Sequence, residues 1–159
     1  MTASIFEYLK GIGLVVLGFV LSQAKEWFSR RRRLRNSWSA LKAEVDICEH
    51  LARTYLQDGA MAPLYRLPTD AFSVSFPILL AEGAIEGDEV KDLESFFGWI
   101  QDINRGLDNA NAAMHSGNNN QLQREYDRLR LKAKELLDGR QGVEPYLARG
   151  RRVLARHLL

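Results

Sequence analysis

An apolar stretch near the amino terminus constrains this 159-residue chain more than any other feature. Residues Gly11–Ala24 carry no charge, but the 14 residues would span only about 21 Å as a helix, short of the roughly 30 Å core of a bilayer. A start at Ile5 gives 20 residues, which is enough, and takes in Glu7 and Lys10. Those two side chains share a helix face and can neutralise each other. Residues Ile5–Ala24 therefore predict a transmembrane helix.

A dense basic segment, residues 25–35, follows the apolar stretch. Its six cations are Lys25, Arg30, Arg31, Arg32, Arg33 and Arg35. Only Lys10 and the terminal amine carry positive charge on the other side. Because positively charged flanks stay in the cytoplasm, we expect residues 1–24 to anchor the chain in the inner membrane, with the carboxy-terminal domain cytoplasmic. The six cations then face lipid headgroups.

Two other interpretations of the apolar stretch exist. A cleaved signal peptide needs its positive charge before the apolar run and small residues after it, whereas here the charge follows. A buried core helix of a soluble protein is the second alternative. The basic segment also has a second interpretation, since six cations in eleven residues can bind RNA or DNA phosphates.

The predicted membrane helix has one polar, small face. Glu7, Gly11, Gly18 and Ser22 fall on it at helical spacing. Gly18 and Ser22 form a small-xxx-small pair, which lets helices approach closely in lipid. A lipid-facing Glu7 is costly, so we expect that side chain to face another helix or water. This face predicts a homo-oligomer.

Helical periodicity dominates the rest of the chain. From Leu34 to Tyr55 apolar residues recur in steps of four and three, the spacing of one helix seam. Later helices are expected after Thr69, with a kink or break at Pro77, from Asp88, between Leu122 and Leu136, and after Pro145. We expect residues 36–159 to form an all-α bundle of four or five helices. The core residues expected to meet are Trp38, Leu41, Val45, Leu93, Phe97, Ile100, Leu129 and Leu136.

Charge is unevenly divided within this bundle. Residues 36–108 hold 5 Lys/Arg against 13 Asp/Glu, a net −8, and residues 109–159 hold 10 against 5, a net +5. The two halves should attract each other, either inside one subunit or between subunits. The alternative is that these charged side chains lie on helix faces in contact with water, which would give the same net charges.

No motif specifies a cofactor, and we expect none. The three histidines, His50, His115 and His157, lie far apart in the chain without a second ligand at paired spacing, so no metal site is expected. Cys48 falls on the apolar seam, where a small buried thiol is usual.

Arg152 and His157 form the pattern Arg-x-x-x-x-His in the last helix. The pattern resembles the signature of HEPN ribonucleases, which are small all-helical domains. The resemblance implies that Arg152 and His157 of paired subunits converge on RNA, with the histidine moving a proton and the arginine holding phosphate. It covers six residues, and Val153 departs from the polar residue usual in that family. A basic amphipathic helix that covers the bundle or touches lipid is the alternative.

A second resemblance covers most of the chain through about Asn109. The apolar helix, the basic junction and the sequences PTDAF, EGAI and FFGWIQDINRGLD are similar to small bacterial membrane-anchored helical proteins. That resemblance implies no particular activity. The sequence as a whole predicts a single-pass inner-membrane protein whose self-associating helical domain acts as a scaffold or membrane effector, with lipid, a second copy and a cytoplasmic protein as partners. The alternative is a membrane-tethered HEPN-like ribonuclease, an enzyme without a metal, whose partner is RNA.

Overall fold

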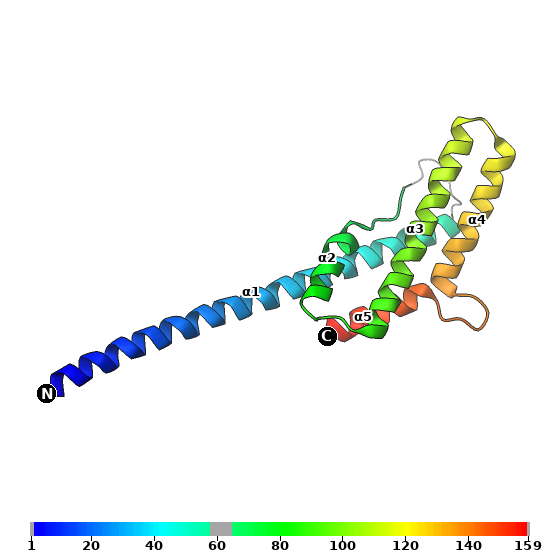
Figure 1. Ribbon diagram of the computed structural model, residues 1–159. Coiled ribbons are helices and arrows are strands. Elements are labelled where there is room, and N and C mark those ends of the chain that lie inside the picture. The colour runs from blue at the N-terminus through cyan, green and yellow to red at the C-terminus, as the bar shows by residue number, and fades with distance from the viewer. Residues whose placement is uncertain (1, 58–64, 159) are drawn as a thin grey trace. The chain divides into compact units, whose positions relative to one another are not determined.

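The computed structural model describes the backbone of residues 2–57 and 65–158, and the side chains of residues 17–57 and 65–158. These residues form five helices (Figure 1): α1 (Thr2–Gln57), α2 (Asp70–Ala81), α3 (Gly87–His115), α4 (Asn119–Asp138) and α5 (Tyr146–His157). The prediction of an all-α helical bundle is confirmed. The chain divides into two units, Met1–Asn36 and Ser37–Leu159. The second differs by one residue from the bundle expected at 36–159.

Helix α1 runs without interruption through the predicted span Ile5–Ala24. Of that span, the side chains of residues 5–16 lie outside the described residues. In the part of the chain whose side chains the structure describes, no helix contains a stretch long and apolar enough to cross a bilayer.

The core of the second unit is built on the seam of α1. The eight residues expected to share a core are all buried, with exposed fractions of 4% for Trp38 and 0% for the other seven. The prediction is confirmed because the seam of α1 and the apolar faces of α3 and α4 face inward together. The seam is therefore used inside its own bundle and does not itself supply a surface for a second copy.

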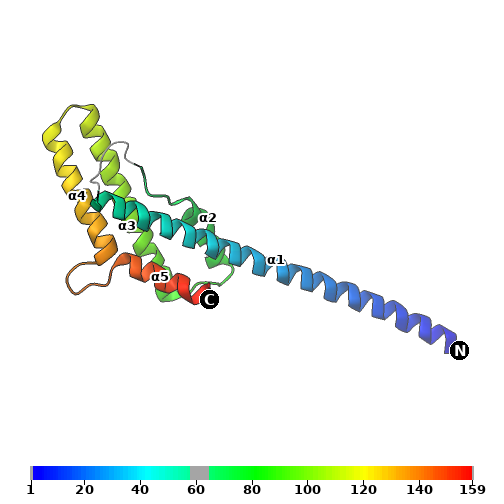
Figure 2. The same ribbon diagram turned by 180° about the vertical axis from the view of Figure 1, so that it is seen from behind.

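Helices α3 and α4 form a hairpin through a short turn, as both views of the ribbon show (Figures 1 and 2). Gly117 in the turn has a φ of 68°, which favours glycine. The side chain of Asn118 then caps α4 by accepting a hydrogen bond from the Gln121 N–H at 3.1 Å. Gly106 of α3 lies so close to α4 that a Cβ there would stand 2.9 Å from Leu129 Cδ2. The missing side chain of Gly106 thus permits the close contact between the two helices.

The start of α2 is capped by a glutamate of α1. Thr69 is predicted as the cap and does occupy the N-cap position, but its side chain makes no capping hydrogen bond. Instead the two carboxylate oxygens of Glu44 accept hydrogen bonds from the N–H groups of Ala71 and Phe72, at 2.8 and 2.7 Å. Glu44 is buried, and its negative charge lies at the positive end of the α2 dipole. The carboxylate of Glu44, from a different helix, therefore caps α2 in place of the Thr69 side chain.

Of the kink or break predicted at Pro77, the break does not occur, because α2 continues across this residue to Ala81. Proline removes one N–H group and crowds the preceding turn. Phe76 and Leu79 on either side of it are buried, and their packing holds the helix together.

Side chains of α1 and α3 also hold the extended residues that precede α2. Asn104 of α3 pairs with the backbone of Leu67 in both directions, since its Oδ1 accepts from the Leu67 N–H and its Nδ2 donates to the Leu67 carbonyl, each at 2.8 Å. The Tyr55 hydroxyl donates to the Tyr65 carbonyl. These bonds satisfy backbone groups that no helix or strand would otherwise pair.

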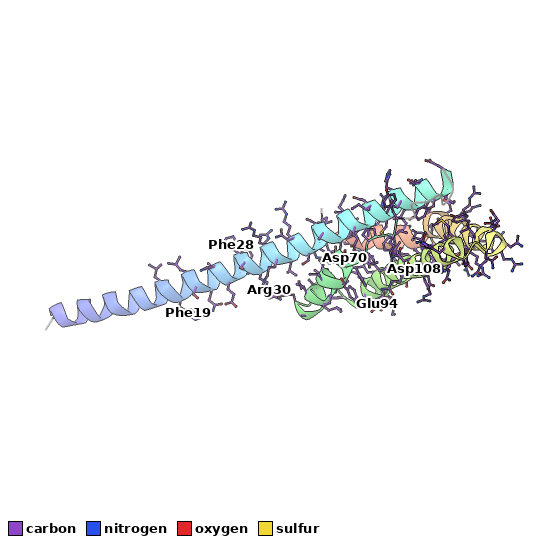
Figure 3. All side chains as sticks on the ribbon, turned by 90° about the horizontal axis from the view of Figure 1, so that it is seen from above. Phe19, Phe28, Arg30, Asp70, Glu94 and Asp108 are labelled. Atoms are coloured by element: carbon purple, nitrogen blue, oxygen red, sulfur yellow. The ribbon has the colours of Figure 1, made fainter. Side chains whose placement is uncertain are left out.

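We expect Glu44→Ala to lower the free energy of unfolding by about 2–3 kcal/mol, because two N–H groups at a buried helix end lose a charged acceptor. Urea unfolding of the full chain in detergent, followed by tryptophan fluorescence, measures this. Glu94→Ala is the control. Glu94 is an exposed glutamate of α3 (Figure 3), and its loss should cost less than about 0.5 kcal/mol. Equal costs at the two positions would contradict the capping role of Glu44.

Candidate functional site

Residues 17–21 of α1 form a collar of exposed apolar side chains, which we call the apolar collar. Leu17, Phe19, Val20 and Leu21 are each between 54% and 65% exposed. Successive residues turn by about 100° around a helix, so these four side chains point in directions spread around the helix axis. Figure 3 shows Phe19 standing off the ribbon. A helix that is apolar on every side is normally surrounded by protein or by lipid.

The basic segment, residues 25–35, continues α1 directly after the collar. All six of its cations lie on exposed residues of the helix. Trp27 and Phe28 are 54% and 64% exposed and meet edge to face, with ring centroids 5.0 Å apart. The Arg31 guanidinium lies over the Trp27 ring, 5.4 Å from its centroid. Cationic and aromatic side chains are thus displayed together within eleven residues.

The predicted association face is described in part. Glu7 and Gly11 lie among residues whose side chains are outside the described ones. Gly18 and Ser22 are both exposed, and a Cβ added at Gly18 would meet nothing within 4 Å among the described atoms. These two small residues are therefore open to close approach in the structure as described.

Arg152 contacts carboxylates from two other parts of the bundle. Its Nη1 donates to the two carboxylate oxygens of Glu144 at 2.7 and 2.8 Å, and its Nη2 donates to Asp92 of α3 at 2.8 Å. The hydrogen bonds to Asp92 and Glu144 raise the pKa of the guanidinium further above its ordinary value. Arg152 thus ties α5 to α3.

His157 lies in a second cluster. Its Nε2 is 3.1 Å from Oε2 of Glu89, and its ring stacks on Trp38 with centroids 4.1 Å apart and planes at 6°. Arg156 also donates to Glu89, at 3.3 Å. Partial burial works to raise the pKa of Glu89, but the bonds from His157 and Arg156 outweigh it and lower that pKa. The Glu89 carboxylate therefore stays ionised to lower pH than an ordinary glutamate, and the ion pair with Arg156 persists with it.

Arg152 and His157 thus contact different partners within one subunit. Since the HEPN resemblance places the pair between two subunits, the ribonuclease interpretation stays a prediction. Loss of RNA cleavage in a His157→Ala variant is the result that would support it.

The attraction between the two oppositely charged halves is confirmed within the chain. Besides the contacts of Arg152 and Arg156, Arg151 pairs with Glu49 and lies 3.5 Å from Asp46. The basic face of α5 is therefore held against carboxylates of α1 and α3. Sequence reasoning missed the individual partners Glu89, Asp92 and Glu49. The charge asymmetry signalled that such partners exist without naming them.

Cys48 lies on the buried seam, as expected. Its Sγ is 3.4 Å from the Pro68 carbonyl oxygen, and burial, with the nearby Glu44 charge, raises the pKa of the thiol to about 12. Among the described residues, no three histidine, cysteine or acidic side chains gather where they could hold a metal ion. His115 is exposed, with Nδ1 2.7 Å from the Asn111 carbonyl oxygen.

No protein-family model, curated protein or solved structure matches this chain.

Proposed function

We propose that this chain is a membrane-anchored helical protein, with residues 5–24 as the anchor, residues 25–35 at the lipid headgroups and residues 36–159 as a cytoplasmic module. The observation that carries the proposal is the apolar collar. Its four side chains point to most sides of α1, and the remaining side carries the small, uncharged Gly18 and Ser22, which suits an apolar environment. Four large side chains exposed to water in this way would be unfavourable.

The basic segment supports the same proposal. Cations directly beside an apolar helix interact with anionic headgroups and hold that end of the helix in the cytoplasm. Trp27 and Phe28 stand between the collar and the first arginine, and aromatic side chains favour the level where lipid meets water. Hydrocarbon, interface and headgroup preferences therefore follow one another along α1 in the order in which a helix would leave a membrane.

The bundle is suited to act as a scaffold or effector module that binds a protein partner near the membrane. Its core side chains are buried, and Arg152 and Arg156 of α5 are paired with carboxylates. The module would then act through its surface, at the place where the anchor holds it.

Replacing Leu17 and Leu21 by lysine should release the chain from membranes. A lysine near the centre of a membrane helix costs about 2.5–3.5 kcal/mol, and the cost falls toward the helix ends, so Leu17→Lys should contribute more than Leu21→Lys. Alkaline extraction of membranes from cells that express the full chain measures the released fraction. The control replaces Ile47 and Leu131 by lysine, which are 50% and 58% exposed in the bundle and differ little in exposure from the collar residues. Release of the wild-type chain, or equal release of both double variants, would overturn the proposal.

We also propose that several copies associate along the face that carries Gly18 and Ser22. A lone helix would expose Glu7 to lipid, whereas packed helices would place it beside protein or water. Gly18→Leu should weaken association in vesicles, measured by energy transfer between labelled copies, because a large side chain blocks close approach. Val20→Leu, on the opposite side of the helix, should leave association unchanged. A wild-type chain that remains monomeric would contradict this interface.

A further inference from the structure

One face of the basic segment forms a groove that is distinct from the rest of the segment. Trp27, Arg30, Arg31 and Leu34 line it. Their spacing of three, one and three residues places all four on the same side of α1. The groove has a volume of about 230 Å³, several times the roughly 30 Å³ that one water occupies in the liquid. It can therefore take a group larger than a single water.

The lining of this groove combines two kinds of chemistry. Trp27 and Leu34 supply apolar surface at its two ends, one turn of helix to either side of the arginines. Arg30 and Arg31 supply two guanidinium groups, that of Arg31 lying over the Trp27 ring, and each guanidinium carries five N–H donors. Guanidinium groups favour phosphate and bind it with two parallel hydrogen bonds.

We propose that this groove binds the phosphate headgroup of an anionic phospholipid, with the glycerol and upper acyl chain against Trp27. The inference rests on the proposed membrane anchor and deepens it, because it names the ligand and the face that holds it. Charge complementarity supports it, since two cations meet one phosphate. Proximity supports it as well: Trp27 lies six residues, or about 9 Å along the helix, beyond Leu21, the last residue of the apolar collar, so the chains of a lipid held at the groove can reach the collar.

Position favours lipid over nucleic acid as the source of the phosphate. A nucleic acid strand would place several phosphates along the cations and gain nothing from an apolar collar next to them. A lipid uses both parts at once, because its headgroup meets the arginines while its chains meet apolar side chains. Lys25 and Arg32, seven residues apart, lie on the opposite side of the helix and would act as general attraction for an anionic surface.

The test compares two double variants that lose the same charge. Full-length chain is reconstituted in vesicles of phosphatidylcholine and phosphatidylglycerol, extracted in mild detergent, and weighed by native mass spectrometry to count retained phosphatidylglycerol. Arg30→Gln with Arg31→Gln should lower retention about tenfold, since two charge-assisted hydrogen-bonding groups are lost. Lys25→Gln with Arg32→Gln, on the opposite side of the helix, should retain the lipid close to the wild-type level. Added inorganic phosphate at equal concentration should not displace it.

Three results would overturn the proposal that this groove binds a phospholipid. Equal loss in both double variants would mean that total charge, and not this face, holds the lipid. Displacement by inorganic phosphate would mean that the glycerol and acyl chain contribute nothing. Displacement by added single-stranded RNA, with RNA retained in its place, would assign the segment to nucleic acid. Each of these results leaves the anchor intact if the variants still incorporate into vesicles, whereas failure of the wild-type chain to incorporate would remove the anchor and the groove together.

Discussion

The carboxylate of Glu44 is the contact on which the arrangement of the bundle depends. It brings a negative charge from the interior of α1 to the first turn of α2, where two N–H groups have no partner within their own helix. A buried carboxylate is costly unless it is fully hydrogen-bonded, so Glu44 and the start of α2 stabilise each other. This fixes where α2 begins on α1, and with it the buried positions of Phe76 and Leu79.

The extended residues before α2 follow from the same constraint. Once α2 is fixed, the segment from Tyr65 to Pro68 must run along α1 and α3, where its backbone groups need partners. Tyr55 and Asn104 supply them, and Leu67 is buried as a result. Helix α5 then closes the bundle by placing its basic face against carboxylates of α1 and α3. Each surface ion pair contributes little alone. Together they hold α5 in the same position as the burial of Val153 and Leu154 does.

The sequence was sufficient for every feature that a periodic pattern can encode. The seam through Trp38, Leu41 and Val45 and the apolar face of α3 were predictable because burial repeats every three or four residues along one helix. The cap by Glu44 and the pairing of Asn104 were not predictable, because each joins residues at least 27 positions apart and a glutamate or asparagine in a helix looks like any other.

The ion-pair partners of α5 could be predicted only in part. The opposite net charges of the two halves predicted an attraction, but charge alone does not say which carboxylate meets Arg152 and which meets His157. The continuity of α2 across Pro77 could not be predicted locally, because tertiary packing outweighs the loss of one N–H group. The proposed groove was missed because its arginines were treated as one cluster. Arg30 and Arg31 differ from the others in lining the groove together with Trp27 and Leu34.

The proposed anchor requires α1 to pass from lipid into water between its apolar collar and the bundle. Nitroxide labels on cysteines introduced at Phe19, Arg32 and Ile47 report this directly, and Cys48 stays unlabelled because its thiol is buried. In vesicles, the label at Phe19 should be relaxed mainly by oxygen, which concentrates in hydrocarbon. The label at Ile47 should be relaxed mainly by a water-soluble nickel complex, with Arg32 between them. A label at Phe19 as accessible to nickel as the one at Ile47 would contradict the account.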